Sequence, residues 1–310
     1  MNPVDPVGNP AINEPKSPAI SRSYPMVWRS LMVLFKVRVV MLLLFAAVGG
    51  ACIAVGGWPG TSNLILLIVT GGMAAAGASA INQYLERDLD ARMERTRRRP
   101  LVSSSVARNR WVPIAGALMI LVPAIAVVPF NAPLAFFVLL GAAIYIGIYT
   151  IWLKRRTPLN IVIGGLAGSA AVLSGSAAAG NWQDPGALLL ALLVFLWTPT
   201  HFWSLAIAYR DDYARGGFPM LPVQVTPRAA SWWVLFNTGG AALAAWVLAT
   251  HPALGWLYLI PVAIATGILV VLNIRLLIAP GRARALALFH ASNLYLAMVL
   301  LLICVNTLVS

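Results

Sequence analysis

The sequence predicts an all-α, polytopic membrane protein with nine transmembrane helices, and three observations support this fold class. Hydrophobic residues make up 60% of the 310 residues and charged residues only 10%, and the mean hydropathy is +0.83. A soluble domain carries about 25% charged residues, so this chain lacks the polar residues that would cover a surface in water. Its apolar residues form runs of about 20, the length of a bilayer-spanning helix. The composition therefore excludes a soluble globular protein and a disordered one.

Polar loops divide the chain into nine apolar segments. These segments lie near 38–57, 62–81, 111–129, 132–153, 159–180, 186–208, 230–250, 254–275 and 284–308. Residues 1–28 are polar and Pro-rich and have no apolar stretch typical of a signal peptide. We expect them to form a disordered cytoplasmic tail, and residues 29–310 to form a single intramembrane domain.

The basic residues predict how the helices are oriented. All 22 Lys and Arg residues precede or open the first apolar segment, or lie in or at the edges of the second, fourth, sixth and eighth loops. In a nine-helix topology these positions share one side of the bilayer, and the positive-inside rule makes that side cytoplasmic. We therefore expect the N-terminus inside and the C-terminus outside, and we read the +13 net charge as a topology signal, not a nucleic-acid site.

A polar face follows the second apolar segment. Asn82, Glu86 and Asp90 recur at intervals of four residues, which places them on one face of a helix. Glu86 and Asp90, about 6 Å apart, would repel by about 3 kcal/mol at an effective dielectric constant near 20. A hard divalent cation with oxygen ligands would offset this repulsion, and Mg²⁺ commonly combines one or two carboxylates with substrate phosphates.

Asp88 points away from that face, and we expect Arg92 and Arg95 to neutralise it, which favours a structural role for this carboxylate. The alternative for the whole acidic cluster is a solvated loop whose carboxylates pair with neighbouring arginines. The regular spacing of Asn82, Glu86 and Asp90 favours the metal-binding interpretation.

A second polar stripe runs from the sixth apolar segment into the loop after it. Pro199 lacks an N–H group and is expected to loosen the helix near its neighbours. The stripe contains Trp197, His201, Leu205, Ala208, Asp212 and Arg215. The two clusters lie four helices apart, which indicates two four-helix modules related by an internal repeat, with a ninth helix added.

These motifs resemble a known family. The pattern N-x-x-x-[DE]-x-x-x-D followed by R-M-x-R-T-x-x-R-P is similar to the first Asp-rich motif of the UbiA-type intramembrane prenyltransferases. Within that superfamily, four stretches resemble the protohaem IX farnesyltransferase (haem O synthase) family, and these are 82–101, 149–168, 197–223 and 288–301. One departure is Lys36-Val37-Arg38, where the family usually has Lys-Pro-Arg.

The resemblance implies a reaction and its partners. Farnesyl diphosphate would transfer its farnesyl group to a vinyl group of haem B and give haem O, a step in haem A and terminal oxidase cofactor biosynthesis. It also implies Mg²⁺ as the cofactor, with haem B as a substrate. The expected location is a bacterial cytoplasmic (inner) membrane with the active-site loops on the cytoplasmic side. Further partners would be the lipid bilayer and haem A synthase or oxidase assembly factors, with no nucleic acid.

The resemblance assigns candidate residues to three roles. Metal binding and catalysis fall to Asn82, Glu86, Asp90 and Asp212. Diphosphate binding falls to Lys154, Arg155, Arg210, Arg215 and Arg95. The haem or acceptor site falls to His201, Trp197, Trp203, Tyr213 and Asn293.

Three alternatives stay open. A UbiA-type enzyme with an aromatic, quinone-precursor acceptor would share the carboxylates. A haem-binding transporter would place ionisable residues near the bilayer midplane, whereas these residues lie at the cytoplasmic helix ends. An electron carrier would need a pair of histidines on facing helices, and the chain has only three histidines.

His201 and His290 are either haem ligands or packing residues, and His251 is expected on the opposite side of the membrane. Cys52 and Cys304 are expected to be small buried hydrophobes.

Overall fold

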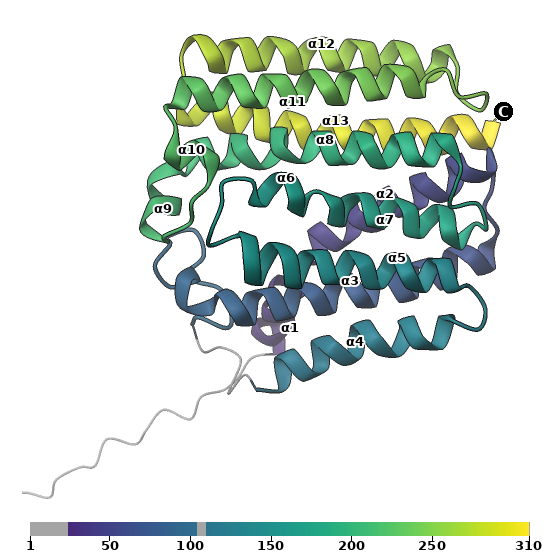
Figure 1. Ribbon diagram of the computed structural model, residues 1–310, viewed down its shortest axis with the longest axis horizontal. Helices are drawn as coiled ribbons and strands as arrows, with labels where there is room; N and C mark the ends of the chain where they lie inside the picture. Colours follow the sequence, from purple (N-terminus) through teal and green to yellow (C-terminus); the bar gives the residue numbers. More distant parts are fainter. Residues whose placement is uncertain (1–23, 104–109, 310) are drawn as a thin grey trace, which may run out of the picture.

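The protein is a bundle of long helices that run roughly parallel to one another (Figure 1). The computed structural model describes residues 24–103 and 110–309, and within these ranges it contains no strand. The helical prediction is therefore confirmed for the part of the chain that is described. Most of the predicted tail, and the segment 104–109, lie outside the described residues.

The first half of the chain contains α1 Tyr24–Leu34, α2 Val37–Val55, α3 Thr61–Asp90, α4 Trp111–Val127, α5 Ala132–Ala143, the π-helix η1 Ile144–Leu153, α6 Asn160–Gly164 and α7 Leu166–Ala178. The second half contains α8 Pro185–Ala208, α9 Arg210–Arg215, α10 Leu221–Gln224, α11 Pro227–Leu248, α12 Trp256–Ile278 and α13 Arg282–Val309. Asn131, Asp184 and Thr226 cap α5, α8 and α11 through their side chains, and each cap precedes a proline in the first helical turn.

The long helices pack in two groups. In the first group, α3 packs on α4, and α7 packs on both α2 and α5. In the second group, α8 packs on α11 and α13, and α12 packs on α11 and α13. Contacts of α2 with α13 and of α7 with α8 join the groups. The connections that carry the basic residues lie together at the end of the bundle where α9 and α10 lie (Figure 1).

Close backbone contacts hold the first group together. A Cβ atom on Gly175 of α7 would lie only 1.7 Å from the Ala47 carbonyl oxygen of α2. The equivalent atom on Gly77 of α3 would lie 2.5 Å from the Gly116 carbonyl oxygen of α4. Only glycine allows two helices to approach this closely, as is typical of helix pairs in membranes.

Seven of the described helical segments are long and apolar enough to cross a membrane, and α4 is a shorter apolar helix. α11 belongs to neither set, although it packs along α8 and α12. The protein is therefore a multi-pass membrane protein. The count of nine spans and the direction in which the termini face stay predictions.

Two element boundaries differ from those expected. The apolar segment expected to end near residue 81 and the polar helical face after it form one continuous helix, the 30-residue α3, whose polar face is paired with basic side chains from other elements. α1 begins at Tyr24, so the helical chain begins inside the segment expected to be a tail.

The tryptophans divide into two sets. Nine of the eleven are exposed and lie at or near helix ends, as expected for residues that sit at the two membrane–water interfaces. Trp197 and Trp203, both on α8, are buried. These two therefore serve a different purpose from the interfacial set.

Candidate active site

The polar face predicted after the second apolar segment lies on the last turns of α3. Asn82, Glu86 and Asp90 are all buried there, whereas the Asp88 side chain is 84% exposed. The separation of Asp88 from the other three is as the helical spacing predicts. The prediction that Arg92 and Arg95 neutralise Asp88 is wrong, because the Asp88 carboxylate pairs with the adjacent Arg87 at 3.6 Å.

Each carboxylate of this face is paired with a basic side chain. Lys154 Nζ lies 2.5 Å from Glu86 Oε1, and Arg99 Nη1 lies 2.6 Å from Asp90 Oδ2. These two cations offset the repulsion between Glu86 and Asp90. In this structure basic side chains therefore do what the spacing of the carboxylates predicted for a metal ion. All four side chains are at most one-fifth exposed, and removing one partner of such a pair leaves a buried charge uncompensated.

Lys36 supplies a third cation. It lies just before α2 in a left-handed backbone conformation, with φ 46°. Its Nζ donates to Asn82 Oδ1 at 2.7 Å and to Tyr145 Oη at 3.0 Å. Burial, followed by the positive charge of Arg99, lowers the pKa of Lys36 to about 7. An anion bound beside Lys36 would raise this pKa again, because it would favour the charged amine.

The π-helix η1 brings its polar residues to the same place. The Thr150 hydroxyl donates to the Tyr145 carbonyl, and the Lys154 amide donates to the Tyr149 carbonyl, each five residues back. Because of this register, Thr150 also reaches Asn82 Nδ2 at 3.0 Å while Lys154 reaches Glu86. π-Helical turns are frequent at functional sites.

Asp212 joins the cluster's outer side from α9. It is buried and accepts hydrogen bonds from the Glu94 amide at 2.8 Å and the Arg95 amide at 3.3 Å, both just after α3. Arg215 Nη2 lies 2.9 Å from the same carboxylate. Burial acts to raise the pKa of Asp212, but the Glu94 amide and the Arg215 guanidinium outweigh it and lower the pKa below its usual range. Asp212 thus holds the loop after α3 against α9.

The remaining diphosphate candidates differ in what they contact. Arg155 donates to the Leu85 carbonyl at 3.1 Å and is exposed. Arg210 donates to the carbonyls of Pro222, Val223 and Val225, which ties α9 to the α10 segment. Arg95 Nη2 lies 3.4 Å from Tyr213 Oη. Of the predicted set, Lys154 alone contacts a carboxylate of α3.

The charges of the cluster favour a polyanion. Three cations, Lys36, Arg99 and Lys154, face two carboxylates, Glu86 and Asp90. Among the described residues, no three His, Cys, Asp or Glu side chains gather in a way that would hold a metal. Asn82, Glu86 and Asp90 offer oxygen atoms of the kind that Mg²⁺ uses when it shares its ligands with a phosphate group, and in this structure these oxygens are paired with Lys36, Lys154 and Arg99.

A buried aromatic group on α8 and α13 lies away from the charges. The His201 ring is stacked between Trp197, with centroids 4.6 Å apart, and Phe289, at 4.4 Å. Its Nδ1 lies 3.0 Å from Ser292 Oγ, and Trp197 Nε1 donates to the Ser292 carbonyl at 2.8 Å. Both faces of the His201 ring are thus covered.

The other acceptor candidates lie in different surroundings. Trp203 is buried, and its Nε1 has no hydrogen-bond partner among the described residues. Tyr213 is buried beside Phe218 near Asp212, close to the charged cluster. Asn293 is half-buried on α13 and bonds weakly, at 3.4 Å, to the Phe289 carbonyl.

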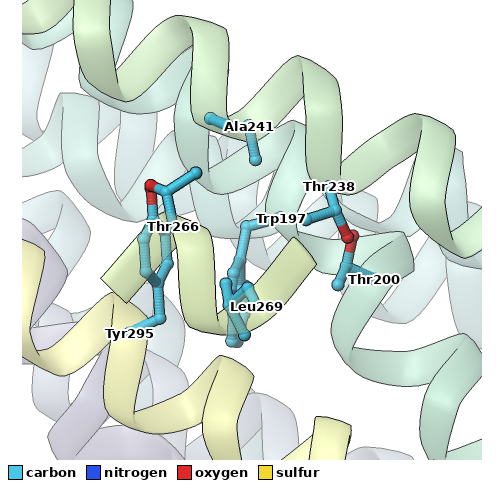
Figure 2. Close-up of a pocket in the computed structure, with 8 residues that line it drawn as sticks. Trp197, Thr200, Thr238, Ala241, Thr266, Leu269 and Tyr295 are labelled. Atoms are coloured by element: carbon cyan, nitrogen blue, oxygen red, sulfur yellow. The ribbon is translucent and has the colours of Figure 1, made fainter. Parts of the chain in front are cut away.

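A small cavity of about 10 Å³ separates α8 from α11, α12 and α13. Figure 2 shows the hydroxyls of Thr200 and Thr238 pointing toward one another, and these oxygens lie 3.1 Å apart. Thr266 bonds the hydroxyl of Tyr295 at 3.3 Å on the other side. The cavity has room for about one water molecule. It is too small for either expected substrate, so it belongs to the packing of the second helix group.

Sequence reasoning missed several residues of the site. Lys36, Arg99, Tyr145 and Thr150 all contact the α3 face or its partners. Lys36 is present in the Lys36-Val37-Arg38 sequence, in which only the family's usual proline is replaced. Arg99 is the arginine of the Arg-Pro pair that ends the first motif. Those two were visible in the sequence as motif positions, whereas nothing local indicated Tyr145 or Thr150.

The fold and this site define a class of protein, a multi-pass helical membrane protein with buried carboxylates and cations at one end of its bundle. The chain belongs to the UbiA prenyltransferase family, which its residues 42–306 match.

Curated relatives share most of this chain. It is 41% identical over 278 residues to protoheme IX farnesyltransferase 2 of Paramagnetospirillum magneticum, which covers 89% of this chain and 96% of that protein. It is 39% identical over 303 residues to protoheme IX farnesyltransferase 1 of Saccharopolyspora erythraea, with 96% of each chain covered. The match to the Thermus thermophilus protoheme IX farnesyltransferase is 40% identical and covers 87% of this chain but 45% of that protein.

Solved structures confirm the fold. A digeranylgeranylglyceryl phosphate synthase superposes with a TM-score of 0.73 at 17% identity and covers 91% of this chain and 99% of its own. A UbiA homologue from Archaeoglobus fulgidus, bound to GPP and Mg²⁺, superposes with a TM-score of 0.56 at 16% identity and covers 88% of this chain and 99% of its own. The expected UbiA-type helical bundle is therefore confirmed.

Proposed function

We propose that this protein transfers the farnesyl group of farnesyl diphosphate to a vinyl group of haem B and so makes haem O. The observation that carries the prenyl-transfer part is the cluster of three cations and two buried carboxylates at the end of apolar helices. The cations can bind the negatively charged diphosphate, and the apolar helices can pack against its isoprenoid chain. The acceptor is proposed from the curated relatives, whose name states that they farnesylate protoheme IX.

In this proposal the α3 face binds the diphosphate end. Asn82, Glu86 and Asp90 would hold Mg²⁺, which when bound supplies positive charge to the departing diphosphate. Lys154 and Arg99 then turn from their carboxylates toward the phosphate oxygens, where charge develops as the allylic C–O bond breaks. Asp212 keeps the loop after α3 in place through the amides of Glu94 and Arg95.

The chemistry at the acceptor needs no strong general base. The allylic carbon loses the diphosphate oxygen and forms a bond to a vinyl carbon of haem B, which leaves a positive charge on the carbon next to the porphyrin. Water adds there and loses a proton, which gives the hydroxyl group of the product. Trp197, His201 and Trp203 are proposed to line the acceptor region because they form a buried group on α8.

The decisive assay supplies haem B, farnesyl diphosphate and Mg²⁺ to membranes that contain the protein, with membranes lacking it as the control. We expect haem whose mass has increased by one farnesyl group and one hydroxyl group. Prenylation of a quinone precursor with no change in haem would replace this function with that of an aromatic-acceptor enzyme. Chelation of Mg²⁺ is expected to stop the reaction, and its restoration is expected to recover it.

We further propose a cytoplasmic-membrane location with the α3–α9 end in the cytoplasm. The support is the gathering of the basic connections at that end (Figure 1). A reporter fused after Ser310 is expected to be extracytoplasmic and one inserted near Ser104 cytoplasmic. Two reporters on the same side would contradict the nine-span topology.

A further inference from the structure

One histidine of the membrane-embedded helices is exposed. His290 lies on α13, about two turns from its first residue Arg282, and its side chain is not covered by neighbouring helices. It shares a stripe with Ala283, Ala287 and Leu294, and Leu294 is 72% exposed. This stripe is apolar apart from His290. An ionisable side chain at such a position within a membrane helix is costly, and when it occurs it usually has a function.

The neighbouring His201 is not available in the same way. Trp197 and Phe289 stack on its two faces, and Ser292 Oγ lies 3.0 Å from its Nδ1. A metal ion could reach its ring nitrogens only after this packing opened. Phe289 lies directly before His290 in the chain, and its ring contacts both histidines, stacked on His201 at 4.4 Å and edge-on to His290 at 5.2 Å.

Apolar side chains are exposed near the beginnings of both α2 and α13. α2 lies close to α13 along the second half of each helix, where a Cβ atom on Gly49 would be 3.0 Å from Leu300 Cδ2 and one on Gly57 would be 3.8 Å from the Thr307 carbonyl oxygen. In the first half of α2, Val39 and Met41 are exposed. The first turns of α13 thus have an uncovered apolar surface around one imidazole.

Positive charge lies on the polar side of that surface. Arg282 and Arg284 are both exposed, and they precede His290 by about 12 Å and about 9 Å at 1.5 Å per residue. The Arg282 guanidinium lies 5.0 Å from the Tyr209 ring. A flat apolar molecule with an electron-accepting metal at its centre and carboxylates on one edge would match an imidazole with arginines nearer the polar boundary. Haem B is such a molecule.

We infer that His290 ligates the iron of the haem substrate, with Arg282 pairing with a propionate, whereas the Arg284 guanidinium donates to the Ala279 carbonyl at 2.8 Å and adds only its positive charge to the region. This inference rests on the proposed function for its choice of substrate. An imidazole nitrogen donates an electron pair to the iron, as in many haem proteins. His201 is then a positioning residue whose stack with Phe289 fixes the turn of α13 that carries the ligand.

The test is a haem titration of the purified full-length protein in lipid nanodiscs, without farnesyl diphosphate and without turnover. Wild type is expected to give the absorption spectrum of histidine-ligated haem. His290→Ala is expected to lose that signature and to bind haem at least tenfold more weakly, and added imidazole should restore the spectrum. His290→Cys is expected to give the distinct spectrum of thiolate-ligated haem.

Two controls separate ligation from general damage. His251→Ala changes a histidine at the other end of the bundle and is expected to leave the haem spectrum unchanged. His201→Ala is expected to keep the histidine-ligated spectrum, and loss of it in that variant with retention in His290→Ala would overturn the assignment. Failure of the wild type to farnesylate haem that it ligates through His290 would overturn the proposed function alone. Farnesylation with a normal haem spectrum in His290→Ala would overturn the ligand assignment alone.

Discussion

The two helix groups have similar plans but contribute differently to the site. In the first group, α3 runs without a break to Asp90 and carries Asn82, Glu86 and Asp90 on one buried face. In the second group, α8 ends at Ala208, and the corresponding carboxylate, Asp212, lies on the separate six-residue α9. The first group therefore holds its carboxylates on a rigid helix, whereas the second presents one from a loop segment.

The two helix groups therefore make different contributions to the site. A rigid helix fixes the distances between carboxylates and cations, which diphosphate ionisation needs. The short segment after Tyr209 is tied by Asp212 to the Glu94 and Arg95 amides, so the second group fixes the loop that follows the rigid face. The interior of the second group holds aromatic rings and hydroxyls in place of charges.

The largest expected effect concerns the rigid face. Glu86→Gln and Asp90→Asn are each expected to lower turnover a hundredfold or more, equivalent to about 2.7 kcal/mol of barrier. Each change removes a charged oxygen ligand and leaves Lys154 or Arg99 without its buried partner. Single-turnover rates with saturating Mg²⁺ measure the effect.

Asp88→Asn is the matched control, because this carboxylate lies on the same helix but is exposed and pairs only with Arg87 among the described side chains. Its activity is expected to stay within threefold of the wild type. Equal losses at Glu86, Asp88 and Asp90 would show that the helical face does not distinguish them.

The packing of the two groups predicts the next effect. Gly175→Ala is expected to destabilise the protein by about 2 kcal/mol, because the new methyl group would overlap the Ala47 carbonyl and force α2 and α7 apart. Gly239→Ala on α11 is the control, since no other part of the described chain lies within 4 Å of the place that its methyl group would occupy. Unfolding in a mixed detergent titration measures both. Similar stabilities would mean that α2 and α7 do not approach as closely as described.

The sequence predicted the α3 face well because a helical period is a local property. Four-residue spacing is enough to place Asn82, Glu86 and Asp90 together, whatever surrounds them. It could not identify Lys36, whose contact with Asn82 spans 46 residues and depends on a left-handed turn.

The register of η1 escaped prediction for a related reason. An apolar run at 144–153 fits an α-helix and a π-helix equally well, and only tertiary contacts select the five-residue spacing that brings Thr150 and Lys154 to α3. The buried stack around His201 likewise depends on Phe289 and Ser292 from α13, about 90 residues further along the chain.

A smaller effect is expected from the basic residues beside η1. Lys154→Ala is expected to raise the KM for farnesyl diphosphate about tenfold, or about 1.4 kcal/mol. Lys154, which directly follows η1, pairs with Glu86 and is the cation proposed to turn toward the diphosphate. Arg155→Ala removes the neighbouring charge, which contacts only the Leu85 carbonyl, and is expected to change KM less than threefold. Similar KM values for the two variants would indicate a general electrostatic field, not a specific contact.

The smallest expected effect compares the two buried tryptophans of α8. Trp197→Phe removes the 2.8 Å bond to the Ser292 carbonyl and is expected to cost about 1 kcal/mol of stability. Trp203→Phe removes an N–H group that has no partner among the described residues, and it is expected to be neutral or stabilising, because an unsatisfied buried donor is itself costly. Thermal unfolding of both variants gives the comparison. A large loss of stability in Trp203→Phe would contradict this expectation, because it would mean that the Trp203 N–H group has a hydrogen-bond partner in the folded protein.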